Sequence, residues 1–389
     1  LKEYYLCGRS LGPWTLAFTF AATSASAGSF MGFPSLIYRY GWILALWIAG
    51  YTVVPLVTMG VLGKRLNQVA RYLGSITIPD LLRDRFQSET LGVLASVVII
   101  IFQSAFMLAQ FKAGGLIMNT LFGFSYETGL IIFSLSVILY TSFGGFRAVV
   151  WTDVMQGIFM VLGVLIMLPL ALKISGGLNE STSILFTRNP ALVHVPGPSV
   201  DGTAFLPLGL AASFFLIFTL GAMSQPSTLV RLMAFRDSKA LSRALLLVCI
   251  YFSLVYIPLV IIFTISRSIL PPLEVSDQVM PLMATFIASP FIAGILIAAP
   301  YAAIMSSVDS FLLIVSSSCS RDIYQRVFNP QASEKKMRTI SQASTVVVGG
   351  TVMLLALNPP ELLQYVIIFA SSGLAAGFLG PILIALFWR

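Results

Sequence analysis

The sequence predicts an all-α polytopic membrane protein with ten transmembrane segments, and three observations carry that prediction. Of its 389 residues, 57% are hydrophobic and only 10% are charged, whereas soluble domains carry about 25% charged residues. The apolar residues also gather in stretches of about 20, which is the length that one helical crossing needs. Finally, these stretches are too uniformly apolar for the alternating strands of a membrane barrel.

We therefore interpret residues 1–389 as a single transmembrane domain. Its ten apolar segments fall at 11–35, 41–63, 91–121, 128–146, 149–172, 206–233, 241–266, 289–319, 341–357 and 362–388. Segments one to five (a first repeat, about 11–172) can be laid over segments six to ten (a second repeat, about 206–388). Because five is odd, the second repeat must run in the opposite direction, which is the arrangement of inverted-repeat (5+5) transporters.

Lysine and arginine are distributed unevenly over the connections between these segments. If the chain starts in the cytoplasm, 18 of the 23 basic residues lie on the inner side, four on the outer side, and Lys112 lies within a segment. Cytoplasmic connections carry such an excess, so the bias predicts the orientation and a multi-pass protein of the plasma membrane, in a bacterium the inner membrane. It also accounts for the net charge of +8 without a nucleic-acid partner.

Two connections are long. Residues 64–90 combine basic residues with Leu81, Leu82 and Phe86, which predicts an amphipathic helix lying on the inner membrane surface. Residues 173–205 are rich in glycine and proline, which predicts an irregular outer loop.

Two segments contain residues that interrupt a helix. Segment one carries ATSASAGSFMGFP from Ala22 to Pro34, and segment six places Gln225 and Pro226 near its centre. Small residues also permit close packing between helices, and a proline can simply kink one. Interruptions at corresponding positions of two inverted halves favour instead a pair of broken helices that frame a substrate site.

Segment eight carries small and hydroxylated residues at helical spacing: Ala303, Ser306, Ser307 and Ser310 share one face. Hydroxyls and carbonyls together form a hard-oxygen environment that suits an alkali cation. Alternatively, the serines bond back to carbonyls of their own helix.

Three of the charged residues within the predicted segments are candidates for a function. Asp309 lies in segment eight, where a carboxylate predicts a functional role. Asp153 in segment five is either functional or a hydrated residue near the inner end. Lys112 is about 30 Å along segment three, so we interpret it as reaching for the outer interface, with pairing to an anionic solute as the alternative.

The sequence gives little support to an enzyme or a channel. Its one histidine, His194, lies in the outer loop, and no HExxH, Walker A or paired-carboxylate motif is present. Nor does it contain a TVGYG-type filter or an arginine ladder. The scattered cysteines Cys7, Cys249 and Cys319 predict neither a disulfide framework nor a metal site.

Five separate motifs resemble signatures of the sodium/solute symporters, which include transporters of proline, glucose, sialic acid and pantothenate. They are GRSLGPW (8–14), MGFP (31–34), FGGFRAVVWTDVMQG (143–157), SQPSTLVRLMA (224–234), and AAIMSSVDSFLL (302–313) with SRDIYQ (320–325). The stretch YETGLIIFSLSVILYTSFGGFRA (126–148) most resembles the pantothenate branch. The resemblance implies a leucine-transporter-like bundle, sodium as the coupling ion, and a chain that lacks the family's leading and trailing helices.

The resemblance also assigns sites. A sodium ion would bind the carbonyls of Ala22, Ala25 and Ala303 and the hydroxyls of Ser306 and Ser307. A second cation or coupling site would use Asp153 with groups of segment eight, namely Ser306, Asp309 and Ser310. Asp309 stands where some relatives have serine, which leaves open a second sodium, a proton or neither. Ser24 stands where the proline branch has an aspartate.

The solute itself is the least specified partner. The pantothenate-like stretch suggests a carboxylate, which needs donors in a low-dielectric pocket. Five residues could supply them: Gln103, Gln110, Lys112, Gln225 and Gln364. Gln110 and Lys112 lie on different faces of one helix, so we expect Gln110 and Gln225 to contact the solute. An amino acid, a sugar or sialic acid is the alternative solute. A cation channel or a non-transporting receptor is the alternative function. The sequence does not specify the oligomeric state.

Overall fold

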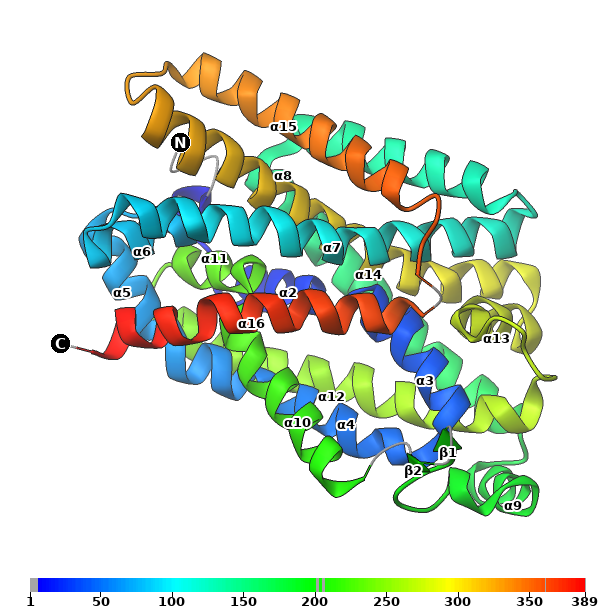
Figure 1. The fold of residues 1–389 in the computed structure, drawn as a ribbon. Helices are drawn as coiled ribbons and strands as arrows, with labels where there is room; N and C mark the ends of the chain where they lie inside the picture. The colour runs from blue at the N-terminus through cyan, green and yellow to red at the C-terminus, as the bar shows by residue number, and fades with distance from the viewer. Residues whose placement is uncertain (1–5, 201–202, 205–206, 361, 389) are drawn as a thin grey trace.

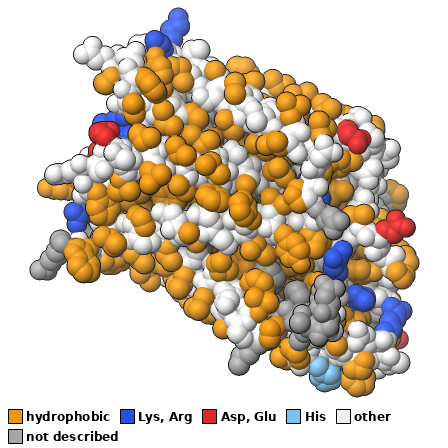
Figure 2. All heavy atoms as spheres, in the orientation of Figure 1, with side chains coloured by type: hydrophobic (Ala, Val, Ile, Leu, Met, Phe, Trp, Pro, Cys, Tyr) orange, Lys and Arg blue, Asp and Glu red, His pale blue; other side chains and the backbone are white. Residues whose placement is uncertain are grey.

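A computed structural model describes residues 6–200, 203–204, 207–360 and 362–388. Long helices run side by side across the molecule, with the described N-terminal residues and the C-terminal end at the same side as α5 (Lys64–Leu73) and α6 (Ile78–Phe86) (Figure 1). Hydrophobic side chains cover the middle of the visible face, and the charged ones gather toward its two ends (Figure 2). This distribution is that of a helical bundle with lipid around its waist.

The first predicted segment is a broken helix. Pro13, which follows Gly12, opens α2 (Pro13–Ser24), as proline at the first helical position favours. The α-helix then ends because Ala25 adopts extended backbone, and the chain resumes as a π-helix, η2 (Gly28–Gly32), and α3 (Phe33–Tyr40). The predicted interruption is therefore present.

The sixth predicted segment is broken as well. Here α10 (Leu208–Gly221) and a short 3-10 turn, η6 (Ala222–Ser224), lead to Gln225 in extended backbone, and α11 (Pro226–Ala234) begins at the proline. The two parts meet at an angle of 48°. Proline lacks the amide hydrogen and clashes with the preceding turn, so the break falls where the sequence places it.

The other helices follow the remaining predicted segments. They are η3 (Gly41–Ile43), α4 (Leu44–Pro55) and η4 (Leu56–Gly63) for segment two; α7 (Glu89–Phe122) for segment three; α8 (Tyr126–Ile174) for segments four and five; then α12 (Ser238–Ile269), α14 (Pro290–Ser317), α15 (Glu334–Leu355) and α16 (Leu363–Phe387). Within α8, Gly145 has positive φ and non-helical backbone, one residue before the end of the fourth predicted segment.

The structure does not by itself confirm the predicted number of ten membrane crossings. In the described part of the chain, five helices are long and apolar enough to cross a membrane alone, and up to seven spans result if each bent pair counts as one. Broken helices such as α2 and α3 are too short to pass individually, and α15 begins in a charged stretch. Ten crossings therefore remain a prediction, while the all-helical bundle is established.

Two connections differ from the sequence predictions. Leu81 and Leu82 of α6 are buried in protein, because this helix packs against α7 and against the π-helix η8 (Ser318–Phe328) that extends α14. The prediction of a helix on the membrane surface is wrong for α6. The outer connection is not wholly irregular either, since it contains α9 (Leu178–Arg188), η5 (Pro190–Leu192) and the strand pair β1 (Ser199–Val200) and β2 (Thr203–Ala204). Elsewhere in the described chain, the remaining short elements are η1 (Cys7–Arg9), η7 (Ser276–Gln278) and α13 (Val279–Ile287).

The helix α14 lies at the centre of the bundle and packs against α8, α7, α15 and α2. Its residues from Ala302 to Ser317 are almost all buried. Both α2 and α8 contact α14. Polar groups on α14 can therefore meet the first helix break, at the end of α2, and the carboxylate of Asp153 on α8.

Candidate functional site

The residues assigned to the sodium site converge at the first break. The Ser306 hydroxyl donates to the carbonyl oxygens of Ala22 (2.9 Å) and Ala303 (3.0 Å). The Ser307 hydroxyl lies 3.1 Å from the Ala303 carbonyl and 3.5 Å from that of Ala25. All five residues are fully buried. The structure thus brings together five neutral oxygen atoms from two parts of the chain, whose contacts join residues 284 and 282 positions apart in sequence.

The break itself supplies the carbonyls. The last regular bond of α2 runs from the amide of Ala25 to the carbonyl of Ala21 (2.9 Å). Beyond it the amide of Ala27 donates to Gln110 Oε1 on α7 (2.8 Å) rather than to a carbonyl of its own helix. The amide of Ser26, which would donate to the Ala22 carbonyl in a continuous helix, faces Ser29 Oγ (3.4 Å) instead. The Ala22 carbonyl is therefore available to Ser306 of α14.

A second polar cluster lies about one turn further along α14. Arg231 of α11 donates from Nη2 to Asp153 Oδ2 (2.7 Å) and to Ser310 Oγ (2.7 Å), and from Nε to Thr19 Oγ1 (2.8 Å). The Thr19 hydroxyl also donates to Asp153. Asp153 has no exposed surface and Arg231 is 1% exposed, so the interpretation of Asp153 as a hydrated helix-end residue is wrong.

Asp309 does not join this ion pair. Its Oδ1 accepts from the Thr141 hydroxyl of α8 (2.6 Å), while the pair of Asp153 with Arg231 includes Ser310 instead. The Ser310 hydroxyl also donates to the Ser306 carbonyl (2.8 Å). Of the four residues assigned to a second cation site, three are thus linked through Arg231 or Ser310, and Asp309 instead bonds to Thr141, which precedes the Gly145 kink of α8.

Arg231 was missed by the sequence reasoning, which counted it among the basic residues of the inner connections. The structure places it in the core, against α2, α8 and α14. The available signal was its position within the apolar run LVRLMA (229–234), where the segment had not yet ended. An arginine inside such a run requires a buried partner, and Asp153 is that partner.

Lys112 also has a buried partner. Its ammonium group donates to Asp277 Oδ2 (2.9 Å) and to the Pro360 carbonyl (3.0 Å), and the residue is only 5% exposed. Asp277 belongs to η7, and it also accepts from the amide of Leu363 at the start of α16 (3.2 Å). The interpretation that Lys112 reaches for the outer interface is therefore wrong, because η7 brings a carboxylate to it.

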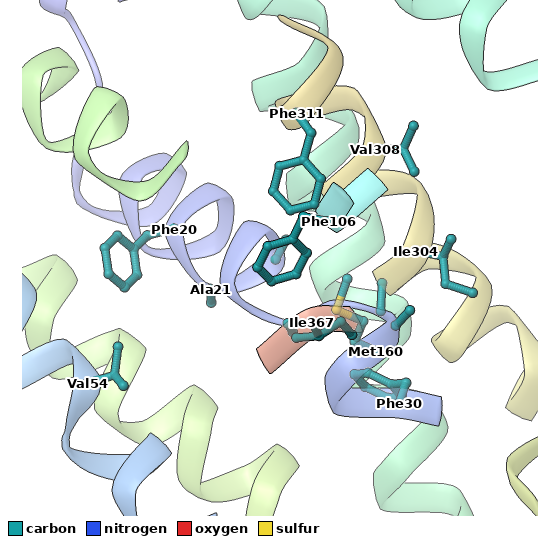
Figure 3. Close-up of a cluster of buried hydrophobic side chains, with 14 of the residues drawn as sticks. Phe20, Ala21, Phe30, Val54, Phe106, Met160, Ile304, Val308, Phe311 and Ile367 are labelled. Atoms are coloured by element: carbon teal, nitrogen blue, oxygen red, sulfur yellow. The ribbon is translucent and has the colours of Figure 1, made fainter. Parts of the chain in front are cut away.

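A cavity lies between the two breaks. Break residues line it from both sides, and so do Phe106 of α7 and Phe311 of α14. These two rings lie next to each other (Figure 3), with centroids 4.9 Å apart. The polar lining consists of Thr23, Ser24, Ser26, Gln225, Ser227, Thr228 and Ser371. Since α4 contributes Tyr51 and Val54, the cavity combines apolar walls with a few hydroxyl and amide groups, as small-molecule sites do.

The five residues assigned to the solute are not all at this cavity. Gln225 lines it. Gln103 and Gln110 lie on the same face of α7 as Phe106, and both are fully buried. Gln364 of α16 packs against η2: a methyl group on Gly32 would lie 2.1 Å from its Oε1, which explains the glycine there. Lys112 is engaged with Asp277.

A helical bundle in which two broken helices frame a polar cavity defines the class of secondary transporters with the leucine-transporter-like fold. Comparison with known proteins agrees. The chain matches the sodium:solute symporter family over residues 4–389 and therefore belongs to it. It is thus a member of a family of multi-pass, sodium-coupled membrane transporters.

Individual relatives cover the whole chain. It is 37% identical to the sodium/pantothenate symporter of Haemophilus influenzae and 36% identical to that of Escherichia coli, in each case over 100% of this chain and 80% of the relative. The osmoregulated proline transporter OpuE of Bacillus subtilis is 30% identical, over 79% of its length. Among solved structures, a Na⁺-coupled sialic acid symporter in an outward-open state matches with a TM-score of 0.81 at 20% identity, covering 100% of this chain and 81% of that one.

Proposed function

We propose that this protein imports a small carboxylate of the pantothenate class together with sodium, by alternating access and without chemical change of the solute. The similarity to two sodium/pantothenate symporters over the whole chain supports this solute class. The observation that carries the sodium part is the group of five buried, neutral oxygens at the first break. An amino acid, a sugar or sialic acid is the alternative solute.

In this mechanism sodium binds between α2 and α14. The ion replaces the contacts that the two serine hydroxyls make with backbone carbonyls, so it holds the broken helix against the centre of the bundle. The cavity beside it then receives the solute, with Gln225 and the hydroxyls of both breaks as donors and with Gln110 Nε2 as a further donor from α7. Lys112 is not needed as a solute contact, because Asp277 already balances its charge.

The sodium gradient supplies the driving force, and the membrane potential adds to it when net charge moves. Moving one net positive charge through 100 mV provides about 2.3 kcal/mol, which corresponds to roughly fifty-fold accumulation. Because a carboxylate carries one negative charge, one sodium per solute is electroneutral, and the potential contributes only if a second cation accompanies the solute. A second coupling position at Asp153, Ser306 and Ser310 is part of the proposal, with Asp309 as a separate buried carboxylate. A channel or a receptor would not concentrate the solute.

The test is uptake into proteoliposomes. Pantothenate, proline, glucose and sialic acid are offered with an inward gradient of sodium or of choline, at a fixed membrane potential. The proposal expects concentrative pantothenate uptake that needs sodium. Uptake of another solute would replace the solute class, current without solute uptake would indicate a channel, and solute binding without uptake would indicate a receptor.

A further inference from the structure

The amide of Ala27 has an unusual partner for a residue at the start of a helical segment. In a continuous helix, the amides of Ser26 and Ala27 would donate to the carbonyls of Ala22 and Thr23. Instead, Ala25 is extended (φ −86°, ψ 114°), and Ala27 donates to the side chain of Gln110 at 2.8 Å. The bond crosses 83 positions of sequence and is fully buried on both sides.

We propose that Gln110 is a positioning residue of the sodium site, which holds the Ala27 amide away from its own helix and so keeps the break open. The inference rests on the proposed sodium site and assigns Gln110 a task besides the solute contact. A buried amide without an acceptor is strongly disfavoured, and the nearest alternative acceptors are carbonyls of the preceding turn. By accepting from Ala27, Gln110 replaces the bond to the Thr23 carbonyl that would continue the helix. With the turn held open, the Ser26 amide faces Ser29 Oγ (3.4 Å) instead of the Ala22 carbonyl, which is left to the ion.

The surroundings of this bond fit such a task. The Ala22 carbonyl faces Ser306 at 2.9 Å, and the Ala25 carbonyl faces Ser307 at 3.5 Å. The helix α7, which carries Gln110, packs against α14, which carries both serines. One rigid pair of helices therefore fixes the hydroxyls of the site and, through Gln110, the backbone that supplies its carbonyls.

The chemistry of the side chain is also specific. The bond needs a neutral or anionic acceptor at the end of a long side chain, and glutamine is the neutral choice. Methionine has a similar length and no comparable acceptor. Glutamate keeps an acceptor oxygen, and its negative charge would favour a nearby cation.

The chain offers a matched control on the same helix. Gln103 lies two turns before Gln110, shares its face of α7 and is also fully buried. Within the described residues, neither amide atom of Gln103 has a hydrogen-bond partner. Replacing it changes the same chemical group in the same helix without removing a bond to the break.

The experiment measures binding of radioactive sodium to the purified protein in detergent, without solute. We expect Gln110→Met to raise the half-saturating sodium concentration about tenfold, while Gln103→Met and Gln110→Glu stay within about threefold of the unsubstituted protein. A tenfold change corresponds to about 1.4 kcal/mol. Because no solute is present, loss of a solute contact cannot produce this result.

The possible outcomes separate the two proposals. Failure of the unsubstituted protein to bind sodium would overturn the sodium site itself. Normal sodium binding in Gln110→Met, or equal weakening in Gln103→Met, would overturn only the role of Gln110. If Gln110→Met does not fold, weakening of the same size in Gln110→Glu would show that an acceptor at this position is not what matters and would also overturn it.

Discussion

Two polar clusters that meet on α14 differ in how their charge is balanced. The cluster of Ala22, Ala25, Ala303, Ser306 and Ser307 contains only neutral oxygens. The neighbouring cluster contains a buried carboxylate, Asp153, and a buried guanidinium, Arg231, which already neutralise each other. Neutral oxygens in a low-dielectric core attract a mobile cation without trapping it permanently, whereas a closed ion pair holds helices together.

The first prediction breaks the charged cluster, where we expect the largest effect. Asp153→Asn leaves the Arg231 guanidinium buried without a counter-charge, so the free energy of unfolding should fall by about 3–5 kcal/mol. Sodium-driven uptake should also fall in the protein that still reaches the membrane. Thermal unfolding in detergent and uptake per inserted protein measure the two effects.

The control for this prediction removes both charges. Asp153→Asn with Arg231→Met should recover most of the lost stability, because no unpaired charge remains. A double variant whose loss of stability equals the sum of the two single losses would show that the two residues act separately. Normal sodium activation of uptake in Asp153→Asn would rule out a coupling role for this carboxylate.

A second prediction tests whether removing one partner of the Lys112–Asp277 ion pair also destabilises the protein. Lys112→Met should destabilise the protein by about 3 kcal/mol, since it leaves Asp277 buried and unpaired. Lys112→Met with Asp277→Asn should restore stability and keep the apparent solute affinity within about twofold of that of the unsubstituted protein. Loss of solute affinity in the double variant, beside normal affinity in Gln110→Ala, would instead make Lys112 the contact for the solute carboxylate.

Both ion pairs mark the limit of what the sequence predicts. The broken helices could be predicted because Gln225-Pro226 and the small residues from Ala22 act locally on backbone geometry. The partners of Arg231 and Lys112 are 78 and 165 positions away, and no local pattern encodes such a distance. A charge inside an apolar segment indicates that a partner exists, but only the packing of helices identifies it.

The residues of the candidate site also differ in how far the sequence could predict their contacts. The spacing of Ser306 and Ser307 placed both hydroxyls on one helix face, and the family resemblance supplied the carbonyls that they meet. The solute residues were harder, because glutamine is common in cores and its role depends on what its amide reaches. Gln225 lines the cavity, whereas Gln110 bonds to the backbone of the break and Gln364 packs on Gly32.

The last prediction concerns the neutral cluster, where the effect on stability should be smallest. Ser306→Ala and Ser307→Ala each remove one oxygen ligand, and we expect the half-saturating sodium concentration to rise about tenfold in each, or about 1.4 kcal/mol. Stability without sodium should change little, since the carbonyls lose a hydroxyl donor but no charge is left unpaired. Sodium binding and uptake as a function of sodium concentration are the measurements.

Thermal unfolding separates this prediction from a general loosening of α14. Sodium stabilises the folded protein in proportion to the logarithm of its concentration over its dissociation constant, so tenfold weaker binding removes about 1.4 kcal/mol of that stabilisation at saturation. Ser317→Ala is the control, because its hydroxyl bonds only to the Ile314 carbonyl of its own helix (2.8 Å) among the described residues. If Ser306→Ala and Ser307→Ala keep the sodium dependence of Ser317→Ala, the ion binds elsewhere, and the difference between the two clusters would reflect packing alone.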